Sequence, residues 1–431
     1  MNIQEMAQKA KKAGIRLSAT PSEVRNKALG NIVDSLHQYQ STILTANQKD
    51  MANAQAEALS APLLKRLKFD ALKLQEVCEG LVSLRQLPDP VGQTLSATEL
   101  DQGLELYQVS CPIGVIGVIF ESRPDALVQI ASLCLKSANA VLLKGGREAA
   151  HTNRILADII SDAAVQAGIP EGWMGLMETR DDVQELLELD RTIDLIIPRG
   201  SNAFVKHIMD NTRIPVLGHA DGICHVYIDK KADLNMACRI TIDSKCQYVS
   251  VCNAAETLLV HIDVAPTFLP DIQSALADHG VEMRGCLRTA ALIDVSPATE
   301  KDWQTEYLDH IISIKIVDNL NQAIDHINQY GSGHTDVIVT QDSQRAQTFI
   351  RQVDTADMMV NCSSRFSDGF RYGLGAEVGI STNKIHARGP VGMEGLMIYQ
   401  WRLMGKGHVV ADYAGPASKS FTHKPIRPEG Q

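Results

Sequence analysis

Residues 112–146 read PIGVIGVIFESRPDALVQIASLCLKSANAVLLKGG, and this stretch decides the fold. It opens with a nearly continuous apolar run, 112–120, which is typical of a strand buried on both faces of a sheet. Apolar residues then recur at helical spacing over 124–136. A second apolar strand, 140–144, follows and ends at two glycines. A strand, a helix and a second strand in this order predict a parallel β/α unit.

The same alternation continues along the chain. A helical pattern covers 148–167, and an apolar strand at 194–197 stops at Pro198-Arg199-Gly200-Ser201 before another helix. Strand-like runs separated by helical patterns return at 226–228, 257–261 and 311–317. The residues therefore predict an α/β fold with two domains, each built on a parallel sheet covered on both faces.

The segments before and after this core have different textures. Thr20-Pro21-Ser22-Glu23 is a capping box with proline at the first helical position, and it predicts a helix whose apolar residues fall over 24–36. A further helical pattern over 64–87 ends before Pro88. Residues 105–109 alternate like a strand. The tail from Tyr413 is rich in proline and serine, so we expect it to lie on a partner subunit or to be disordered.

Bulk composition narrows the function classes. The chain has 431 residues, enough for two or three domains, and its net charge of -10 argues against nucleic acid or an anionic membrane as a partner. Residues 1–20 lack the apolar core of a signal peptide, and no later apolar run approaches the roughly 20 residues of a membrane span. Nine cysteines without a CxxC pair indicate a reducing, cytoplasmic location.

Two loops follow the carboxyl ends of predicted parallel strands, where ligands of such sheets bind. They are Lys144-Gly145-Gly146 and Arg199-Gly200-Ser201, and each joins a cation to a glycine ahead of a helix. Such a loop either holds phosphate or is a tight turn with a solvated base, and the residues alone leave both interpretations open. No GxGxxG motif opens a βαβ unit here, so the ordinary dinucleotide fingerprint is absent.

One cysteine stands out as a candidate nucleophile. Cys252 lies in the small and polar loop 249–255, just before an apolar strand, and a thiol in a loop can face a cleft. Cys246, six residues earlier, competes for the same argument, and spacing cannot separate the two. The 13 histidines show no metal-ligand spacing such as HExxH, so no metal site is predicted. The run 331–334, Gly-Ser-Gly-His, is interpreted as a polar turn.

These motifs carry a family resemblance. The chain resembles, over nearly its whole length, the γ-glutamyl phosphate reductases, also called glutamate-5-semialdehyde dehydrogenases, of the aldehyde dehydrogenase superfamily. The matching segments are 112–124, 143–149, 197–201, 218–225, 251–257, 330–335 and 386–392. The resemblance implies NADPH-dependent reduction of L-glutamyl 5-phosphate to L-glutamate 5-semialdehyde with release of phosphate. This is the second step of proline biosynthesis from glutamate.

The resemblance also assigns roles at the reacting centre. It places the nucleophile, which forms a thioester, at Cys252 and gives Cys246 no role. Ser122 falls where the superfamily carries an oxyanion-hole asparagine, and Asn253 is a second candidate donor. The family's cofactor contacts fall on Lys144, Gly145, Gly146, Gly200, Ser201 and Glu306, and the preference for NADPH comes from the family alone.

The substrate and the fate of the thioester follow from the same comparison. Because the substrate is anionic at both ends, cations should line its pocket, and the candidates are Arg123, Arg199, His219, Arg371 and Arg388. Ordinary aldehyde dehydrogenases carry a general-base glutamate in the stretch corresponding to 217–222, and none is present here. That base activates water against the thioester, so its absence favours discharge by hydride.

The superfamily implies that different parts of the chain form domains with different functions. We expect an NADP-binding domain at 1–97 and 112–222, a catalytic domain at 223–394, and an oligomerisation arm with tail at 98–111 and 395–431. Expected partners are a second copy of the chain, as dimer or tetramer, and glutamate 5-kinase, which would supply the labile substrate. The rival hypotheses are an aldehyde dehydrogenase that makes a free acid and a catalytically silent member that serves as a binding or assembly partner.

Overall fold

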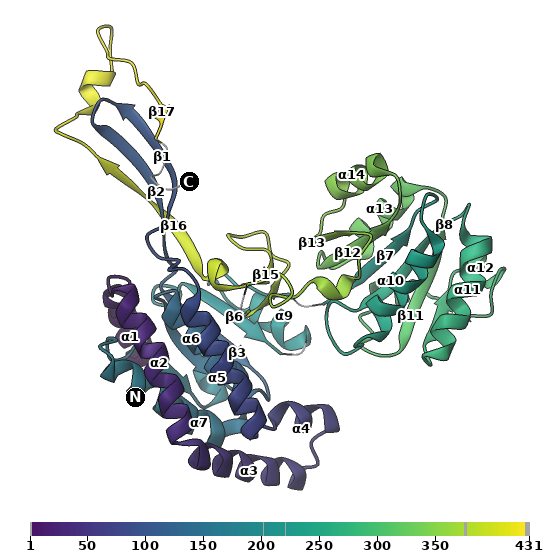
Figure 1. Cartoon of the computed structure of the whole chain (residues 1–431), viewed down its shortest axis with the longest axis horizontal. Helices are drawn as coiled ribbons and strands as arrows, with labels where there is room; N and C mark the ends of the chain where they lie inside the picture. Colours follow the sequence, from purple (N-terminus) through teal and green to yellow (C-terminus); the bar gives the residue numbers. More distant parts are fainter. Residues whose placement is uncertain (1, 201, 220, 375–376, 427–431) are drawn as a thin grey trace. The chain divides into compact units, whose positions relative to one another are not determined.

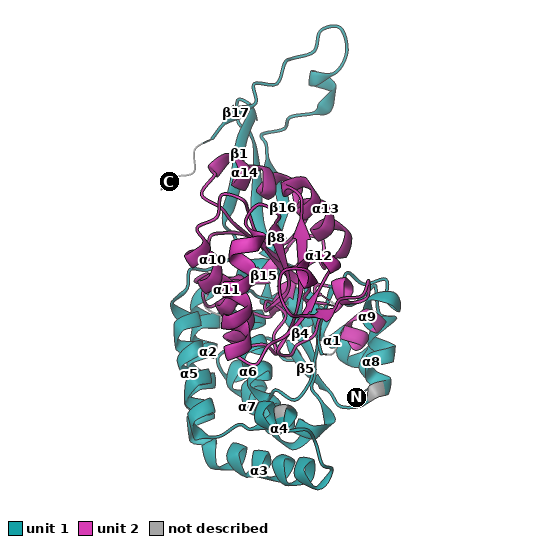
Figure 2. Cartoon of the chain, turned by 90° about the vertical axis from the view of Figure 1, so that its right-hand side faces the viewer, with its two compact units in different colours: residues 1–200, 208–216, 392–431 teal, residues 201–207, 217–391 magenta. Residues whose placement is uncertain are grey.

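The computed structural model describes residues 2–200, 202–219, 221–374 and 377–426. The chain divides into two compact units, coloured separately in Figure 2. Unit 1 comprises residues 1–200, 208–216 and 392–431, and unit 2 comprises 201–207 and 217–391. Each unit contains its own parallel sheet, and unit 1 also carries an antiparallel sheet. The predicted α/β class is confirmed, whereas the functions expected for the separate domains stay predictions.

The parallel sheet of unit 1 has the strand order β5-β4-β3-β6. Its strands are β3 (Val115–Phe120), β4 (Ala140–Lys144), β5 (Met174–Met177) and β6 (Leu195–Arg199). Every residue of β3 and β4 is buried, which is the burial that their continuous apolar runs predict. In the register, Ile119 pairs with Lys144 and Phe120 with Arg199. The carboxyl ends of β3, β4 and β6 therefore meet at one edge of the sheet.

Helices, of which α1 to α7 are labelled in Figure 1, supply most of the remainder of unit 1. They are α1 (Ile3–Leu17), α2 (Ser22–Gln38), α3 (Gln40–Ala56), α4 (Ala61–Leu67), α5 (Ala71–Gln86), α6 (Pro124–Lys136), η1 (Arg147–Ala149), α7 (Ala150–Gln166), α8 (Arg180–Leu187), η4 (Met393–Leu396) and η5 (Val410–Tyr413). Helix α9 (Asn202–Asp210) begins in unit 2 and ends in unit 1. Among the described residues, no helix is both long and apolar enough to cross a membrane.

The single helix predicted over 64–87 is wrong, because two helices occupy that range. The side chain of Asn47 interrupts the backbone: its Nδ2 donates to Leu67 O (2.9 Å) and its Oδ1 accepts from Phe69 N (2.8 Å). Asp70 then caps α5 by accepting from Lys73 N (3.0 Å). A distant buried amide thus breaks a helical pattern that the local sequence does not interrupt.

The loop before β3 is held by one carboxylate. Asp194 Oδ2 accepts from Val115 N (2.8 Å), and Asp194 Oδ1 accepts from Lys11 Nζ (2.6 Å). Gly114 lies against this carboxylate with φ +133°, and a Cβ on residue 114 would overlap Asp194 Oδ2. Glycine is therefore required here both by conformation and by close approach.

Replacing Gly114 with alanine should lower the unfolding free energy of unit 1 by about 3 kcal/mol, because backbone strain and overlap with Asp194 add. Urea unfolding of the purified chain measures the loss. Gly92→Ala is the matched control, since Gly92 has φ +82° but nothing within 4 Å of its Cβ position. It should cost only about 1 kcal/mol. Equal losses in the two variants would show that the Asp194 contact contributes nothing.

The antiparallel sheet forms an arm with the strand order β16-β2-β1-β17. Its strands are β1 (Thr94–Asp101), β2 (Leu104–Pro112), β16 (Met397–Met404) and β17 (Lys424–Pro425). Chain segments from before β3 and from the C-terminal region thus build one sheet (Figure 1). The strand expected at 105–109 is present as part of β2.

The expectation for the tail is wrong over residues 413–426, because this segment lies on the arm of its own chain. Thr422 N donates to Leu100 O (2.8 Å) and Ile426 N to Ala97 O (3.0 Å). The Tyr413 hydroxyl donates to Asp101 Oδ2 (2.8 Å), and the Tyr413 ring stacks on Phe421 at 4.5 Å. Backbone pairing and one aromatic stack hold a segment that has no apolar core of its own. Residues 427–431 lie outside the described range.

Unit 2 is built on a larger parallel sheet with the order β10-β9-β11-β8-β7-β12-β13. The strands are β7 (Cys224–Ile228), β8 (Ala255–His261), β9 (Glu282–Gly285), β10 (Ser296–Pro297), β11 (Ile311–Val317), β12 (Thr335–Val339) and β13 (Asp357–Val360). A separate pair joins β14 (Gly379–Ser381) to β15 (Gly389–Val391). The central strands β7, β8 and β12 are buried throughout. Their ends position the loops described next.

The helices of unit 2 pack on this sheet. They are α10 (Leu234–Cys246), α11 (Ala265–Asp278), α12 (Leu287–Ala290), η2 (Asp302–Gln304), α13 (Leu320–Tyr330), α14 (Ser343–Gln352) and η3 (Ser364–Phe366). Side chains of α10 and α11 form a core with β7, β8, β11 and β12, and those of α13 and α14 form a second core. Two apolar cores explain why these strands are buried throughout.

Candidate active site

Cys252 lies in the turn between α10 and β8, and its side chain is partly exposed. Its backbone is tightly enclosed. A Cβ on Gly222 would overlap Cys252 O, so only glycine allows the segment before β7 to approach so closely. The same carbonyl accepts from Cys224 Sγ (3.1 Å). The turn is thus fixed by its main chain while the thiol stays accessible.

Two imidazoles lie beside the thiol. Candidate donor atoms of His219, Cys252 and His334 all lie within 4.8 Å of one another. His219 Nδ1 donates to Ile380 O (2.8 Å), and His334 Nδ1 contacts Thr335 Oγ1 (2.8 Å). The His334 ring is fully buried. A neighbouring imidazole can accept a thiol proton, which is the arrangement that activates cysteine nucleophiles.

Cys246 occupies a different environment. It is the last residue of α10 and lines a cavity of about 820 Å³ together with Cys238 and Cys362. Burial raises the pKa of the Cys246 thiol, which disfavours the thiolate, although the neighbouring Lys245 ammonium acts in the opposite sense. The described lining of this cavity contains neither His219 nor His334, and the assignment of the nucleophile to Cys252 stays a prediction.

Asn253 connects the nucleophile loop to the segment after β13. Its Nδ2 donates to Ser367 O (2.6 Å), and its backbone carbonyl accepts from Ser364 Oγ (2.6 Å). Asn253 is 4% exposed, and its Oδ1 has no hydrogen-bond partner among the described residues. One amide hydrogen is thus already used, and the second is the donor that an oxyanion could share.

The same segment brings two arginines toward Cys252. Arg365 is 8% exposed, and its Nε donates to Gln247 Oε1 (3.0 Å). Burial lowers the pKa of Arg365, and the nearby Cys252 thiolate acts in the opposite sense. Arg371 Nη1 donates to Arg365 O (3.0 Å). Arg365 therefore places a buried cation close enough to Cys252 for the two charges to interact.

Glu306 lies in the loop that follows η2 and faces the start of α9. Its Oε2 accepts from Asn202 Nδ2 (2.5 Å), and the Gly222 backbone amide also donates to it. Burial raises the pKa of the Glu306 carboxyl, and these two hydrogen bonds oppose that rise. Because Gly222 also packs on Cys252, Glu306 and the nucleophile belong to one site within unit 2.

In unit 1, Lys144 is the last residue of β4 and is only 8% exposed. Its Nζ donates to Gly145 O (2.6 Å). The two glycines after it have no room for side chains, because a Cβ on Gly145 would overlap Asn153 and one on Gly146 would overlap Glu148. The predicted loop is therefore a tight turn that carries a buried ammonium at the carboxyl edge of the sheet.

Ser122 follows β3 and has the left-handed φ of +43°, which is unusual for a residue other than glycine. Its backbone N donates to Glu148 Oε1 (2.7 Å), and its hydroxyl donates to the same oxygen (2.5 Å). The side chain is buried. Since the one hydroxyl proton is directed to Glu148, an oxyanion role for Ser122 would require that bond to break.

The remaining predicted residues are placed as follows. Arg199 ends β6, whereas Arg123 is exposed at the start of α6 and Gly200 is exposed after β6. Ser201 lies outside the described residues. Arg388 Nη1 donates to Asp354 Oδ1 (3.1 Å), so its charge is already balanced by a carboxylate.

The structure thus assembles two groups of predicted residues. Unit 2 joins Cys252, Asn253, His219, Glu306 and Arg371. Unit 1 places Ser122, Lys144, Gly145, Gly146 and Arg199 along the carboxyl edge of its sheet. Sequence reasoning did not assign Asn202, Cys224, His334 or Arg365. His334 lies inside segment 330–335, which resembles the family and could have indicated this residue. Arg365 lies in none of the segments that resemble the family.

Comparisons with known proteins identify the family of the chain. The model of the aldehyde dehydrogenase family matches residues 1–285 and 277–375. The gamma-glutamyl phosphate reductase of Acetivibrio thermocellus is 60% identical over 423 residues, covering 98% of this chain and 98% of that protein. The corresponding protein of Pelotomaculum thermopropionicum is 59% identical over 424 residues, again covering 98% of each chain.

A solved structure has the same fold as this chain. The crystal structure of gamma-glutamyl phosphate reductase from Thermotoga maritima matches with a TM-score of 0.93 and 40% identity, covering 95% of this chain and 100% of that chain. This confirms the predicted aldehyde-dehydrogenase-like architecture. The chain therefore belongs to the aldehyde dehydrogenase family and, within it, to the gamma-glutamyl phosphate reductases.

Proposed function

We propose that this chain reduces L-glutamyl 5-phosphate to L-glutamate 5-semialdehyde with NADPH and releases phosphate, the second step of proline biosynthesis from glutamate. One observation carries the proposal: the Cys252 thiol lies beside two imidazoles, in a turn faced by a segment, 217–222, that contains no glutamate. The names of the relatives, which are 59–60% identical over nearly the whole chain, support the substrate.

In the first half-reaction the Cys252 thiolate attacks the acyl carbon of the substrate. A C–S bond forms, the C–O bond to phosphate breaks, and phosphate leaves with the electron pair. His219 or His334 holds the proton taken from the thiol. The Cys252 amide and Asn253 Nδ2 stabilise the tetrahedral oxyanion, where the loss of one donor typically costs about 3 kcal/mol.

In the second half-reaction the thioester is reduced to the aldehyde. A nicotinamide cofactor, when bound, would supply the hydride that reduces the thioester carbon. The C–S bond then breaks, and Cys252 leaves as the thiolate. Without a carboxylate base in 217–222, water is not activated against the thioester, so the acyl group is kept for reduction.

The donor set fits a nicotinamide dinucleotide. Membership of the aldehyde dehydrogenase family implies such a cofactor, and NADPH rather than NADH is part of the proposal. Glu306 offers a carboxylate to ribose hydroxyls, and Lys144 offers an ammonium. The glycines at Gly145, Gly146 and Gly200 would allow the cofactor to approach the backbone closely, and Ser201, which lies outside the described residues, is kept as a predicted contact. Asn202, which orients Glu306, is a positioning residue in this proposal.

Cations recognise the two anionic ends of the substrate. We add Arg365 to the expected set because it is buried and electrostatically coupled to Cys252. Arg371, bonded to the backbone of Arg365, lies next to it. The two guanidinium groups would stabilise the departing phosphate. Arg123, Arg199 and His219 remain candidates for the substrate carboxylate, and Arg388 would act while paired to Asp354.

The deciding experiment is an assay of the purified chain in the oxidative direction. Glutamate 5-semialdehyde and NADP⁺ are supplied with and without phosphate, and products are identified by mass spectrometry. Phosphate-dependent NADPH formation supports the reductase. Phosphate-independent oxidation to glutamate would instead establish the rival aldehyde dehydrogenase. A silent binding protein would show neither reaction, and NADPH at 100 times its Kd would not add the ~2.7 kcal/mol of stability expected of a bound cofactor.

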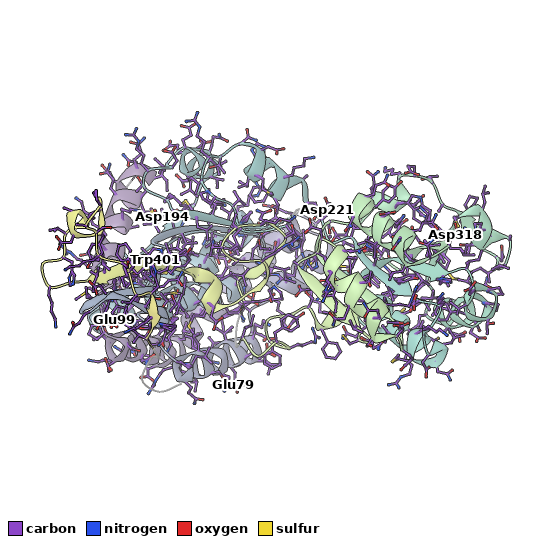
Figure 3. The ribbon with its side chains drawn as sticks, turned by 90° about the horizontal axis from the view of Figure 1, so that it is seen from above. Glu79, Glu99, Asp194, Asp221, Asp318 and Trp401 are labelled. Carbon is purple, nitrogen blue, oxygen red and sulfur yellow. The ribbon has the colours of Figure 1, made fainter. Side chains whose placement is uncertain are left out.

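We further propose that a second copy of the chain covers the arm at β16. This strand lies at one edge of its sheet, and residues 398–404 are all exposed. Its apolar members are Ile398, Tyr399, Trp401, Leu403 and Met404. Figure 3 labels Trp401 on this strand. An edge strand with exposed apolar side chains is a pairing surface, and monomers normally protect such edges.

The double variant Trp401→Glu/Leu403→Glu should convert the oligomer to monomers, because it places charges of one sign within an apolar interface. Analytical ultracentrifugation measures the mass. Leu287→Glu is the control: Leu287 is 90% exposed in unit 2, so its replacement should leave the mass unchanged. An unchanged mass in the arm variant would remove β16 as the interface.

The cysteines and the lability of the substrate bear on the location and the partner of the chain. All nine cysteines are free, which supports a reducing, cytoplasmic location. Because an acyl phosphate is labile in water, we propose glutamate 5-kinase as a partner that hands over the substrate directly. Co-purification of the two enzymes tests this partner. Turnover by the two enzymes together, measured with and without an excess of unrelated protein, tests whether the substrate is handed over directly.

A further inference from the structure

The nucleophile and the two imidazoles beside it form a donor set that could also hold a metal ion. His219, Cys252 and His334 come from three different segments of unit 2, and their candidate donor atoms lie within 4.8 Å of one another. Two imidazoles and a thiolate are the ligands that Zn²⁺ prefers, and a soft thiolate disfavours Mg²⁺ and Ca²⁺. The cluster is invisible in sequence because residues 219, 252 and 334 are far apart.

Both imidazoles are oriented as in metal sites. Metal-bound histidines usually donate the second ring N–H to a carbonyl, carboxylate or water. His219 Nδ1 donates to Ile380 O at 2.8 Å, and His334 Nδ1 contacts Thr335 Oγ1 at 2.8 Å. These contacts fix both ring orientations, and Nε2 is the candidate ligand atom of His334.

An independent observation points to a missing partner at His334. The side chain is 0% exposed, and its Nε2 has no hydrogen-bond partner among the described residues. Leaving such a buried polar atom unsatisfied typically costs about 1–3 kcal/mol. A metal ion bound to Nε2 would recover that loss.

The geometry needs only a small adjustment. Zn–S bonds of about 2.3 Å and Zn–N bonds of about 2.0–2.1 Å place tetrahedral ligand atoms roughly 3.3–3.6 Å apart. Closing the observed spread of up to 4.8 Å requires movements of about 1 Å. Cys252, partly exposed in a turn, can supply most of that movement. Three protein ligands leave the fourth position to water.

We propose that His219, Cys252 and His334 bind Zn²⁺ reversibly and that the metal inhibits the chain by occupying the Cys252 thiolate. The binding claim is independent of the proposed reaction, whereas the inhibition claim rests on the proposed function. Because the ligands must lose their protons, affinity rises with pH.

Cobalt(II) titration of the full-length chain tests binding without substrate. One equivalent of Co²⁺ should produce the absorption of a thiolate-to-cobalt charge transfer, and Zn²⁺ should displace it. Cys252→Ala should abolish the band, and His334→Ala or His219→Ala should each weaken binding at least about tenfold. Cys246→Ala and His310→Ala are the controls and should bind as the parent does. His310 is exposed in unit 2.

Circular dichroism of each variant checks that the fold is intact. An undiminished band in Cys252→Ala, or no band in the parent chain, overturns the proposal. Zn²⁺ should also protect Cys252 from iodoacetamide, and a chelator should restore alkylation. If the metal binds and protects the thiol in a chain that shows no reductase activity, the site stands and the proposed reaction falls.

Discussion

Replacing Cys252 with alanine should reduce phosphate-dependent oxidation of glutamate 5-semialdehyde by at least about 1,000-fold, because the thioester cannot form without the sulfur. The fold should remain intact, since the side chain is partly exposed and alanine leaves the carbonyl that Cys224 contacts. Initial rates of NADPH formation measure the loss. Stabilisation of the variant by NADPH shows that the cofactor site is unaffected.

Cys246 provides the matched control. It lies six residues away in the same unit, yet it ends α10 and lines a separate cavity. Cys246→Ala should keep kcat/KM within about threefold of the parent and lose at most about 1 kcal/mol of stability. Near-normal turnover in Cys252→Ala, or a comparable loss in Cys246→Ala, would be incompatible with a thioester on Cys252.

Six strands of the two parallel sheets were predictable because they are apolar runs, namely β3, β4, β6, β7, β8 and β11, whereas β5, β9, β10, β12 and β13 were not predicted. The stretch 112–146 gives β3, α6 and β4 almost residue by residue. Sequence patterns failed where a distant side chain decides local structure. Asn47 splits the helix expected over 64–87, and β1 pairs with a tail that has no apolar core of its own. Neither contact has a signature within the segment that it reorganises.

The candidate site shows the same limit. Cys252 could be found from its loop and motif, but the surrounding groups come together only through the sheet topology. His334 directly precedes β12 and was interpreted as part of a polar turn, although it is fully buried beside the thiol. Arg365 lies after β13, more than 100 residues from Cys252, and carries no local pattern. Burial and convergence, which identify both residues, are properties of the folded chain.

The second large effect concerns a buried ion pair next to the nucleophile loop. Lys245 Nζ donates to Glu256 Oε2 at 2.6 Å, and both side chains are 0% exposed. Glu256 Oε1 also accepts from Leu308 N (3.2 Å), two residues after Glu306. The pair therefore ties α10 and β8, which flank Cys252, to the loop that carries Glu306.

Lys245→Met should lower the unfolding free energy of unit 2 by about 3–5 kcal/mol at pH 8, because it leaves the Glu256 carboxylate buried without a counter-charge. Urea unfolding measures the loss. The double variant Lys245→Met/Glu256→Leu is the control and should recover most of it, since an apolar pair needs no compensation. If the single variant loses under about 1 kcal/mol, the ion pair does not hold these elements together.

The unfolding free energy lost in Lys245→Met should also depend on pH, and the direction of that dependence can be predicted. Burial raises the pKa of the Glu256 carboxyl from 4.5 to about 7, and the Lys245 ammonium limits the rise. Between these values the folded chain keeps a proton that the unfolded chain has released, so stability falls as pH rises. Without Lys245 the pKa of the Glu256 carboxyl in the folded chain rises further. The pH range over which stability falls therefore extends to higher pH. The unfolding free energy of Lys245→Met should therefore be closest to that of the parent near pH 5 and farthest from it above pH 7. The opposite dependence on pH would refute a buried, uncompensated Glu256.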